Sequence, residues 1–239
     1  MTSLNSKNIE DQRYDAVLFD LDGTLSDSLP VILESRQRLL DNHGIQKSKE
    51  QIADERKSVL FYEELCINFD KKLSEQEYKD LSKEYFEIQE NLIGQYVRLF
   101  PGVLQVLQEL KRQEIPMGII TIRNQESTNK FVHYLKIKEF FTIIVAPDGF
   151  AHPKPHPDQV NFALEQMGLR GEKWTQSRDA RILYVGDALI DVETAEQAKC
   201  DCAIVPYASF AIDDEVKSRI KYLPTRVEDL LQIALHRTQ

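Results

Sequence analysis

The sequence predicts an α/β protein with a doubly wound, mostly parallel sheet and an inserted, all-helical second domain. Five short runs rich in Val, Ile and Leu are continuously apolar, as strands covered on both faces of a parallel sheet must be. Amphipathic stretches with helical periodicity separate these runs, and this alternation is typical of doubly wound folds. One long section lacks any strand-like run, which predicts the helical insert.

The expected strands follow one another along the core. They span residues 16–20, 117–121, 142–146, 182–186 and 203–205. Core helices are expected at residues 103–113, 127–135, 159–167 and 192–199. A polar stretch over residues 170–179, which contains the single tryptophan, Trp174, is expected to form a surface loop.

The insert is expected between the first strand and the rest of the core. Its helix-like stretches, residues 31–42, 49–66 and 74–96, carry charged residues on their outer faces. The core pattern resumes after Pro101 and Gly102, which mark a turn. We therefore expect three parts. They are a loose tail over residues 1–13, an α/β core formed by residues 14–28 and 99–239, and a helical domain formed by residues 29–98.

Composition is typical of a soluble globular chain. It is 42% hydrophobic and 29% charged over 239 residues, and no run of 18 apolar residues could span a membrane. The first 13 residues are polar and unlike a secretory signal, so a cytoplasmic location without a membrane partner is expected. Three cysteines, Cys66, Cys200 and Cys202, do not suggest a disulfide framework.

The charge balance limits the class of ligand. The formal net charge is −9, from 39 acidic and 30 basic residues, and no basic run is present. Nucleic acid would therefore be repelled, and no nucleic-acid partner is expected. An anionic ligand must be small and held in a site that a cation or a few basic side chains neutralise.

Polar side chains follow four of the expected strands. Ligands of parallel sheets bind outside the carboxyl ends of the strands, so these side chains are expected to converge there. In strand order they are Asp20 and Asp22, Thr121, Lys154, and Asp187 with Asp191.

This set of residue types has a chemical logic. Carboxylates held close together repel one another unless a cation joins them, and Mg²⁺ prefers such oxygen ligands and bridges to phosphate. A lysine and a threonine hydroxyl can hold the remaining phosphate oxygens. One carboxylate can attack phosphorus, and a second can transfer a proton.

Four segments resemble known signatures. The segment Asp20-Leu21-Asp22-Gly23-Thr24-Leu25-Ser26-Asp27-Ser28 closely resembles the first signature of the haloacid dehalogenase superfamily, in its phosphoglycolate-phosphatase-like branch. Thr121 resembles the second signature, Lys154 in Lys-Pro-His-Pro-Asp the third, and Gly186-Asp187-Ala188-Leu189-Ile190-Asp191 the fourth. The resemblance covers about residues 14–206. It implies a Rossmann-like core, and the insert looks like the small helical cap domain of this branch.

The resemblance implies roles in phosphoryl transfer. Asp20 would attack the phosphoryl group and form an aspartyl-phosphate, while Thr121 and Lys154 would bind the phosphoryl oxygens. Asp22 would protonate the leaving oxygen and later deprotonate the water that hydrolyses the intermediate. An ordinary aspartate has a pKa of roughly 3.9, so the pKa of Asp22 must be raised for it to act as an acid near neutrality.

The resemblance also implies Mg²⁺ as the cofactor. Asp20, the backbone carbonyl of Asp22, and Asp187 would hold the ion. Asp191 would ligate through a water or contact Lys154.

The expected activity is hydrolysis of a small phosphorylated metabolite by a monomer or homodimer. The carboxylate at Asp22 favours phosphate esters, because the superfamily's dehalogenases and phosphonate-cleaving members lack one there. One alternative is a phosphomutase like β-phosphoglucomutase, which Thr24 and Leu25 weakly disfavour. The other is a binding or regulatory protein that keeps the fold without turnover.

The chain departs from the branch at three places. Relatives usually carry Asn and then Lys or a small residue after the second signature, whereas this chain has Ile122-Arg123-Asn124. Arg123 is expected either to reach an anionic substrate or to face solvent. The helix after the fourth signature ends in Lys199-Cys200-Asp201 instead of Ala-Gly, so its end must be made differently. Residues 51–65 contain no glycine, unlike many caps, so the substrate is not assigned.

Overall fold

The computed structural model describes residues 13–55, 61–171, 179–207 and 212–235. The expected tail, except for Arg13, and most of the expected loop around Trp174 lie outside the described residues. The chain divides into two compact units, one formed by Met1–Asp27 with Leu99–Gln239 and the other by Ser28–Arg98. We call them the core unit and the helical unit.

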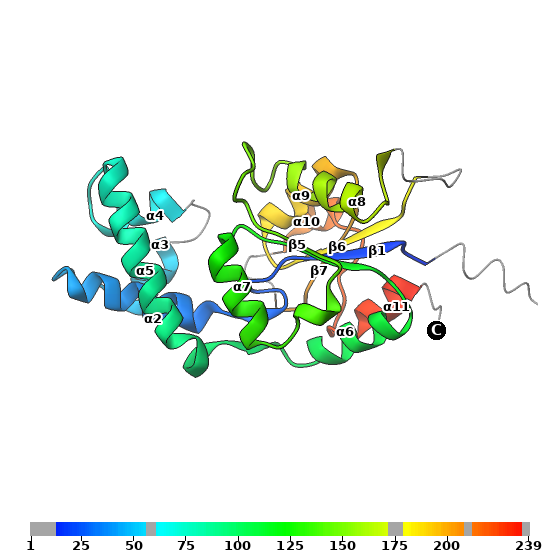
Figure 1. The fold of residues 1–239 in the computed structure, drawn as a ribbon, viewed down its shortest axis with the longest axis horizontal. Helices are drawn as coiled ribbons and strands as arrows, with labels where there is room; N and C mark the ends of the chain where they lie inside the picture. The colour runs from blue at the N-terminus through cyan, green and yellow to red at the C-terminus, as the bar shows by residue number, and fades with distance from the viewer. Residues whose placement is uncertain (1–12, 56–60, 172–178, 208–211, 236–239) are drawn as a thin grey trace, which may run out of the picture. The chain divides into compact units, whose positions relative to one another are not determined.

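The core unit is built on a five-stranded parallel sheet (Figure 1). Its strands, in spatial order, are β5 (Ile143–Val145), β4 (Met117–Ile120), β1 (Ala16–Phe19), β6 (Ile182–Gly186) and β7 (Asp201–Ile204). The strand β1 lies at the centre, paired with β4 on one side and β6 on the other. The predicted fold class, a doubly wound parallel sheet with an inserted helical segment, is confirmed.

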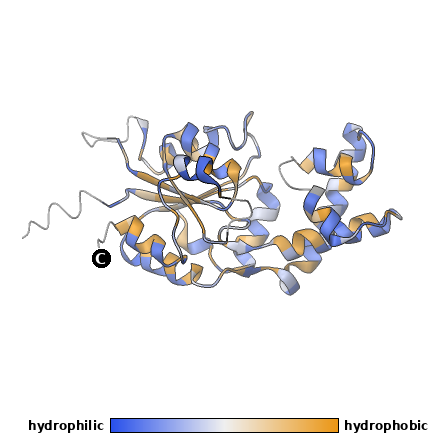
Figure 2. Cartoon of the chain, turned by 180° about the vertical axis from the view of Figure 1, so that it is seen from behind, coloured by the Kyte–Doolittle hydropathy of each residue, from blue (hydrophilic) through white to orange (hydrophobic). Residues whose placement is uncertain are grey.

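Helices cover both faces of this sheet. On one face, Ala16 and Leu18 pack with Val160 and Val192, which belong to α8 (Asp158–Gln166) and α9 (Leu189–Ala198). On the other face lie α6 (Val103–Arg112) and α11 (Asp229–Leu235) (Figure 1). Because successive strand residues face opposite layers, both layers need apolar side chains, which explains the continuous apolar runs (Figure 2).

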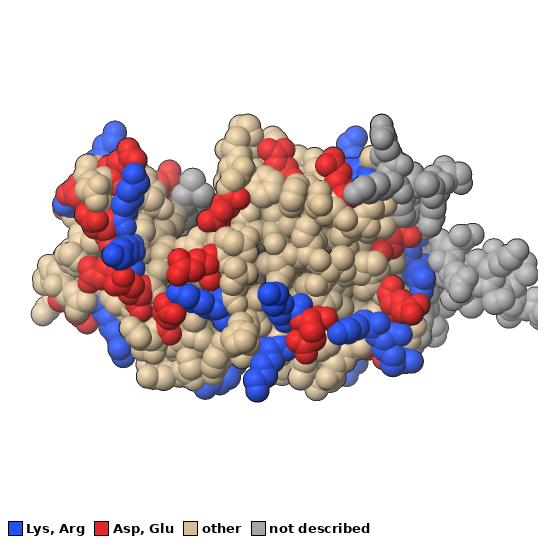
Figure 3. Space-filling view, in the orientation of Figure 1, with Lys and Arg blue, Asp and Glu red and all other residues tan. Residues whose placement is uncertain are grey.

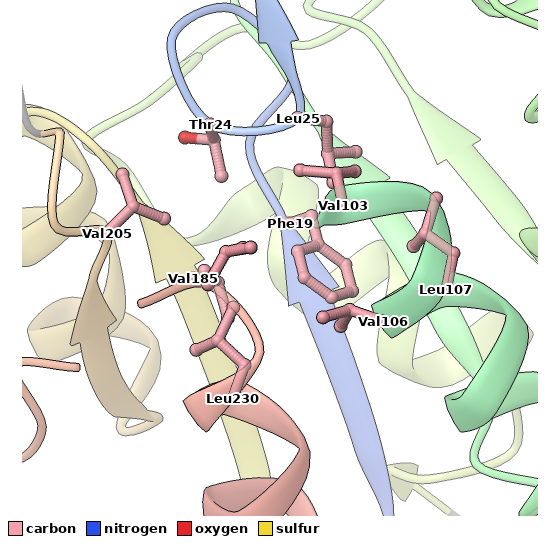
Figure 4. A pocket seen from close by; sticks show the side chains of 10 residues that line it. Phe19, Thr24, Leu25, Val103, Val106, Leu107, Val185, Val205 and Leu230 are labelled. Carbon is pink, nitrogen blue, oxygen red and sulfur yellow. The ribbon is translucent and has the colours of Figure 1, made fainter. Parts of the chain in front are cut away.

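The face covered by α6 and α11 contains one small apolar cavity (Figure 4). Phe19, Val106, Val185 and Leu230 are among the side chains that line it. Its volume of about 10 Å³ is barely that of a water molecule, so it is a packing defect and not a metabolite site.

The core unit also contains α7 (Gln125–Tyr134), the 3₁₀ helix η1 (Lys138–Phe140) and α10 (Asp214–Arg219). Where the chain passes between the two units, β2 (Ser26–Asp27) and β3 (Arg98–Leu99) form a two-stranded sheet.

In the described part of the helical unit, all regular secondary structure before Arg98 of β3 is helical. The helices are α2 (Leu29–Asn42), α3 (Lys49–Glu55), α4 (Phe61–Asn68) and α5 (Glu75–Tyr96). The stretch expected to be helical over residues 49–66 therefore contains two helices, α3 and α4. A capping box between Ser74 and Glu77 starts α5. In the interior of the helical unit, the guanidinium of Arg36 forms an ion pair of 2.9 Å with Glu64 and lies over the rings of Phe61 and Tyr85.

The described surface agrees with the composition. Acidic and basic side chains are interspersed on the face shown in Figure 3 and do not gather into a basic patch there. Within the described ranges, none of the helices has the length and apolar character needed to cross a membrane.

Candidate active site

A tight loop after β1 brings the first signature against the end of β6. The backbone N–H of Gly23 donates to the Ser26 carbonyl at 2.8 Å. Gly23 has φ = +90°, and a Cβ atom on it would lie 2.4 Å from the Asp187 carboxylate, so only glycine fits. The Thr24 hydroxyl lies 3.3 Å from an oxygen of Asp20 and 3.2 Å from one of Asp187. The loop and the end of β6 are thereby held together.

Three buried carboxylates meet at this edge of the sheet. One oxygen from each of Asp20, Asp187 and Asp191 lies within 4.8 Å of the others. The second oxygen of Asp191 accepts hydrogen bonds of 3.1 Å from the backbone N–H groups of Asp187 and Ala188. Gly186 makes room for this side chain, since a Cβ atom there would lie 2.2 Å from the Cβ of Asp191. Asp191 is thus fixed by the turn between β6 and α9.

Lys154 neutralises part of this acidic cluster. Its side chain is only 1% exposed, and its Nζ lies 2.7 Å from Oδ1 of Asp20 and 2.8 Å from Oδ1 of Asp191. It also donates to the Ile120 carbonyl and the Tyr184 hydroxyl, each at 3.2 Å. The ammonium group is therefore surrounded by acceptors from β4, β6, α9 and the loop after β1.

Gln159, at the start of α8, fastens the loop that carries Lys154. Its Oε1 accepts from the Lys154 backbone N–H at 3.0 Å. Its Nε2 donates to the Thr121 carbonyl at 3.0 Å and to the Val145 carbonyl at 3.3 Å, at the ends of β4 and β5. One amide side chain therefore sets the position of the lysine relative to two strand ends.

Burial and charge act in opposite directions on these groups. Burial raises the pKa of Asp20 well above its ordinary value; the nearby Asp191 and Asp187 carboxylates add to this, and Lys154 offsets part of it. Burial alone would lower the pKa of Lys154, but the Asp191 and Asp20 carboxylates raise it well above its ordinary value. Lys154 is therefore a permanent cation in this site.

Thr121 lies buried at the end of β4, beyond its last residue. Its hydroxyl accepts a hydrogen bond of 3.0 Å from the backbone N–H of Arg123, and its own N–H donates to the Val145 carbonyl at 3.1 Å. Together with the bond from Gln159 to its carbonyl, these contacts place Thr121 at the same sheet edge as the loop of Lys154.

The Asp22 side chain does not join the acidic cluster. This side chain is 20% exposed and is held by Arg123, with Nε 2.8 Å from Oδ2 and Nη2 2.7 Å from Oδ1. The Arg123 side chain is 6% exposed, so the expectation that it faces solvent is wrong. Its Nη1 donates to the Ser127 hydroxyl at 2.7 Å, and its guanidinium carbon lies 3.6 Å from the centre of the Phe131 ring.

Sequence reasoning missed three residues at this edge. Tyr184 lies in an apolar run, Gln159 at a helix start, and Thr24 inside a signature with no contact assigned to it. A hydroxyl or amide in a segment that otherwise reads as buried is the only sequence signal that marks them.

His152 and His156, which flank Lys154, lie with their Nδ1 atoms 3.4 and 3.0 Å from the Asp158 carboxylate.

Comparison with known proteins gives consistent matches. The model of a family described as haloacid dehalogenase-like hydrolase matches residues 17–205. The chain is 28% identical over 219 residues to a phosphoglycolate phosphatase of Photorhabdus laumondii, and the matched region covers 90% of each chain. It is 26% identical over 192 residues to pyrophosphatase PpaX of Oceanobacillus iheyensis, and the matched region covers 80% of this chain and 83% of that one.

The fold is similar to that of a solved structure from Bacteroides fragilis, described as a haloacid dehalogenase-like hydrolase. The TM-score is 0.76 at 24% identity, over 91% of this chain and 100% of the other. At this identity the likeness concerns the fold alone.

Proposed function

Because the chain belongs to the haloacid dehalogenase-like hydrolase family, we propose that it is a Mg²⁺-dependent phosphatase, which hydrolyses a small phosphomonoester through an aspartyl-phosphate. One observation carries the proposal. A buried lysine lies between Asp20 and Asp191 at the carboxyl ends of the strands, with Asp187 beside them. The relatives named as a phosphoglycolate phosphatase and a pyrophosphatase support phosphate chemistry.

The donor set fits Mg²⁺. All the candidate ligand atoms are oxygens, and one ammonium cannot balance three neighbouring carboxylates. Asp20, Asp187 and the backbone carbonyl of Asp22 would hold the ion. Both oxygens of Asp191 already accept hydrogen bonds, which favours for it the role of fixing Lys154. When bound, the ion would offset the negative charge of the phosphoryl oxygens.

The chain's own residues divide the reaction between them. An oxygen of Asp20 attacks phosphorus, and the bond between phosphorus and the leaving oxygen breaks. Asp22 gives that oxygen a proton, then takes one from the water that attacks the aspartyl-phosphate and releases phosphate. Lys154 and the hydroxyl of Thr121 bind the phosphoryl oxygens and stabilise their charge in the transition state. The helical unit, Ser28–Arg98, is proposed to be a cap that selects the leaving group.

The test is phosphate release from a panel of phosphate esters, including p-nitrophenyl phosphate, with and without Mg²⁺. Asp20→Asn should lower kcat by on the order of 10³-fold or more, since it removes the nucleophile. Asp214→Asn, whose side chain is fully exposed on α10, is the matched control and should retain the wild-type rate. Full turnover by Asp20→Asn would overturn the mechanism.

The same panel separates the alternatives. A phosphomutase would isomerise β-glucose 1-phosphate without releasing phosphate. A non-catalytic member would give no Mg²⁺-dependent release from any ester.

A further inference from the structure

Asp22 differs from the other acids of the site in its burial and in its hydrogen-bond partners. Asp20, Asp187 and Asp191 are buried and bounded by Lys154, Thr24 and backbone N–H groups. The Asp22 side chain is more exposed and lies in the tight loop after β1, where an aspartate side chain has several rotamers available. A group that transfers a proton must be held within a fraction of an ångström of its partner. Asp22 therefore needs a partner that orders it.

Arg123 has the geometry for this task. Its fork contacts both oxygens of Asp22, which fixes the plane of the carboxylate as well as its distance. The guanidinium is itself held by the hydroxyl of Ser127 and by the ring of Phe131, and both residues belong to α7. The arginine is thus positioned by α7, independently of Asp22.

We propose that Arg123 is a positioning residue that acts through Asp22, and that it does not bind the substrate's own anionic groups. This inference rests on the proposed function, in which Asp22 transfers the proton. The Arg123 side chain is almost fully buried between Asp22, Ser127 and Phe131, which leaves little surface for a substrate. Arg123 therefore couples α7 to the loop of the first signature and fixes the orientation of the Asp22 carboxylate.

A purely structural pair would also join the loop to α7, so the test must separate the two roles. In the full chain with Mg²⁺, Arg123→Ala should lower kcat by about 10²-fold with little change in KM, because misplaced catalytic groups act on the chemical step. Added millimolar guanidinium should restore part of this loss. Arg123→Lys keeps the charge without the fork, so its kcat should lie between those of wild type and Arg123→Ala.

Arg112→Ala is the matched control. Arg112 makes the same kind of fork onto Glu109, at 2.8 and 2.7 Å, on the exposed side of α6. Its loss should leave kcat unchanged, and guanidinium should have no effect on it. For Arg123→Ala, a raised KM with unchanged kcat would overturn the proposal in favour of substrate binding. A lowered thermal midpoint with unchanged kcat would overturn it in favour of a structural role.

One measurement does not depend on turnover. The Nε–H of Arg123 should give an NMR signal protected from exchange in the wild type and unprotected in Asp22→Asn. An unprotected signal in the wild type would overturn the proposal even in an active enzyme. Absence of phosphate release by the wild type would instead refute the proposed function and, with it, the catalytic role of this pair.

Discussion

At the scale of single residues, the positive charge of Lys154 offsets part of the negative charge of the site. A buried ammonium is stable only beside opposite charge, and here it has Asp20 and Asp191 within 2.8 Å. Three acids still share one base, so the described cluster retains excess negative charge. Under the proposed function, the lysine would bind a phosphoryl group and a metal ion would offset the excess negative charge.

Tyr184 is expected to tune this lysine. Its hydroxyl lies 3.2 Å from both Nζ of Lys154 and Oδ1 of Asp191. Tyr184→Phe keeps the packing of the ring but removes these contacts. We expect the free energy of unfolding to fall by about 0.5–1.5 kcal/mol, and kcat/KM to fall several-fold because Lys154 loses a fixed neighbour. Urea unfolding and steady-state kinetics measure the two effects.

Tyr14 provides the control for that prediction. It is also buried, and its hydroxyl bonds to Asp201 and Tyr222, which are not among the predicted site residues. Tyr14→Phe should reduce stability without reducing kcat/KM. Equal losses of kcat/KM in both variants would show that the effect of Tyr184 is not specific to the site.

The site residues that could be predicted from the sequence are those that follow the carboxyl ends of strands. Asp20, Lys154, Asp187 and Asp191 could be expected together because the carboxyl ends of parallel strands share one edge. The partner of Asp22 could not be inferred, because the direction of the Arg123 side chain depends on how α7 packs. Tyr184 was hidden for a similar reason, since a tyrosine in an apolar strand reads as core.

At the scale of elements, the end of α9 is made at a conformational cost. Lys199 caps the helix with φ = 58° and ψ = 41°, in the left-handed region, and the Cys200 N–H bonds back to the Ala195 carbonyl at 2.8 Å. Lys199→Gly should raise the free energy of unfolding by about 1 kcal/mol, because glycine adopts this conformation without a Cβ clash. Chemical denaturation measures it.

Lys199→Ala serves as the control, because alanine keeps the Cβ atom and should bring no gain. If glycine destabilised the protein instead, contacts of the lysine side chain would have to outweigh the backbone strain.

Element prediction succeeded where burial dominates. All five core strands and the four core helices α6, α7, α8 and α9 were predicted, with ends shifted by up to three residues. The strands β2 and β3 were missed because each has two residues, too few for a pattern. The helices α10 and α11 were missed because six and seven residues form too short a window for helical periodicity.

At the scale of the whole molecule, the acidic cluster links stability to metal and pH. In the metal-free protein, burial raises the pKa of Asp20, so the folded state binds this proton more tightly than the unfolded state. The contribution of Asp20 to stability therefore falls as pH rises from its unfolded pKa of roughly 3.9 towards its raised folded pKa. Under the proposed function, Mg²⁺ would bind the deprotonated carboxylates and reverse this loss.

The expected result is a larger rise in thermal midpoint on adding Mg²⁺ at neutral than at mildly acidic pH. A metal concentration of about 100 times Kd would add about 2.7 kcal/mol of stability. EDTA should abolish the rise, and Asp187→Asn should weaken it while stabilising the metal-free protein. An equal rise at both pH values would indicate that the ion binds away from these carboxylates.

The central place of β1 in the sheet has a consequence for how the protein is made. Val17 pairs with Met117 on one side and with Leu183 on the other, so its two partners lie 100 and 166 residues further along the chain. During synthesis, β1 leaves the ribosome before its first partner, β4, and stays unpaired until the whole helical unit and α6 have followed. Such long-range pairing makes folding slow and exposes β1 to aggregation in the interval.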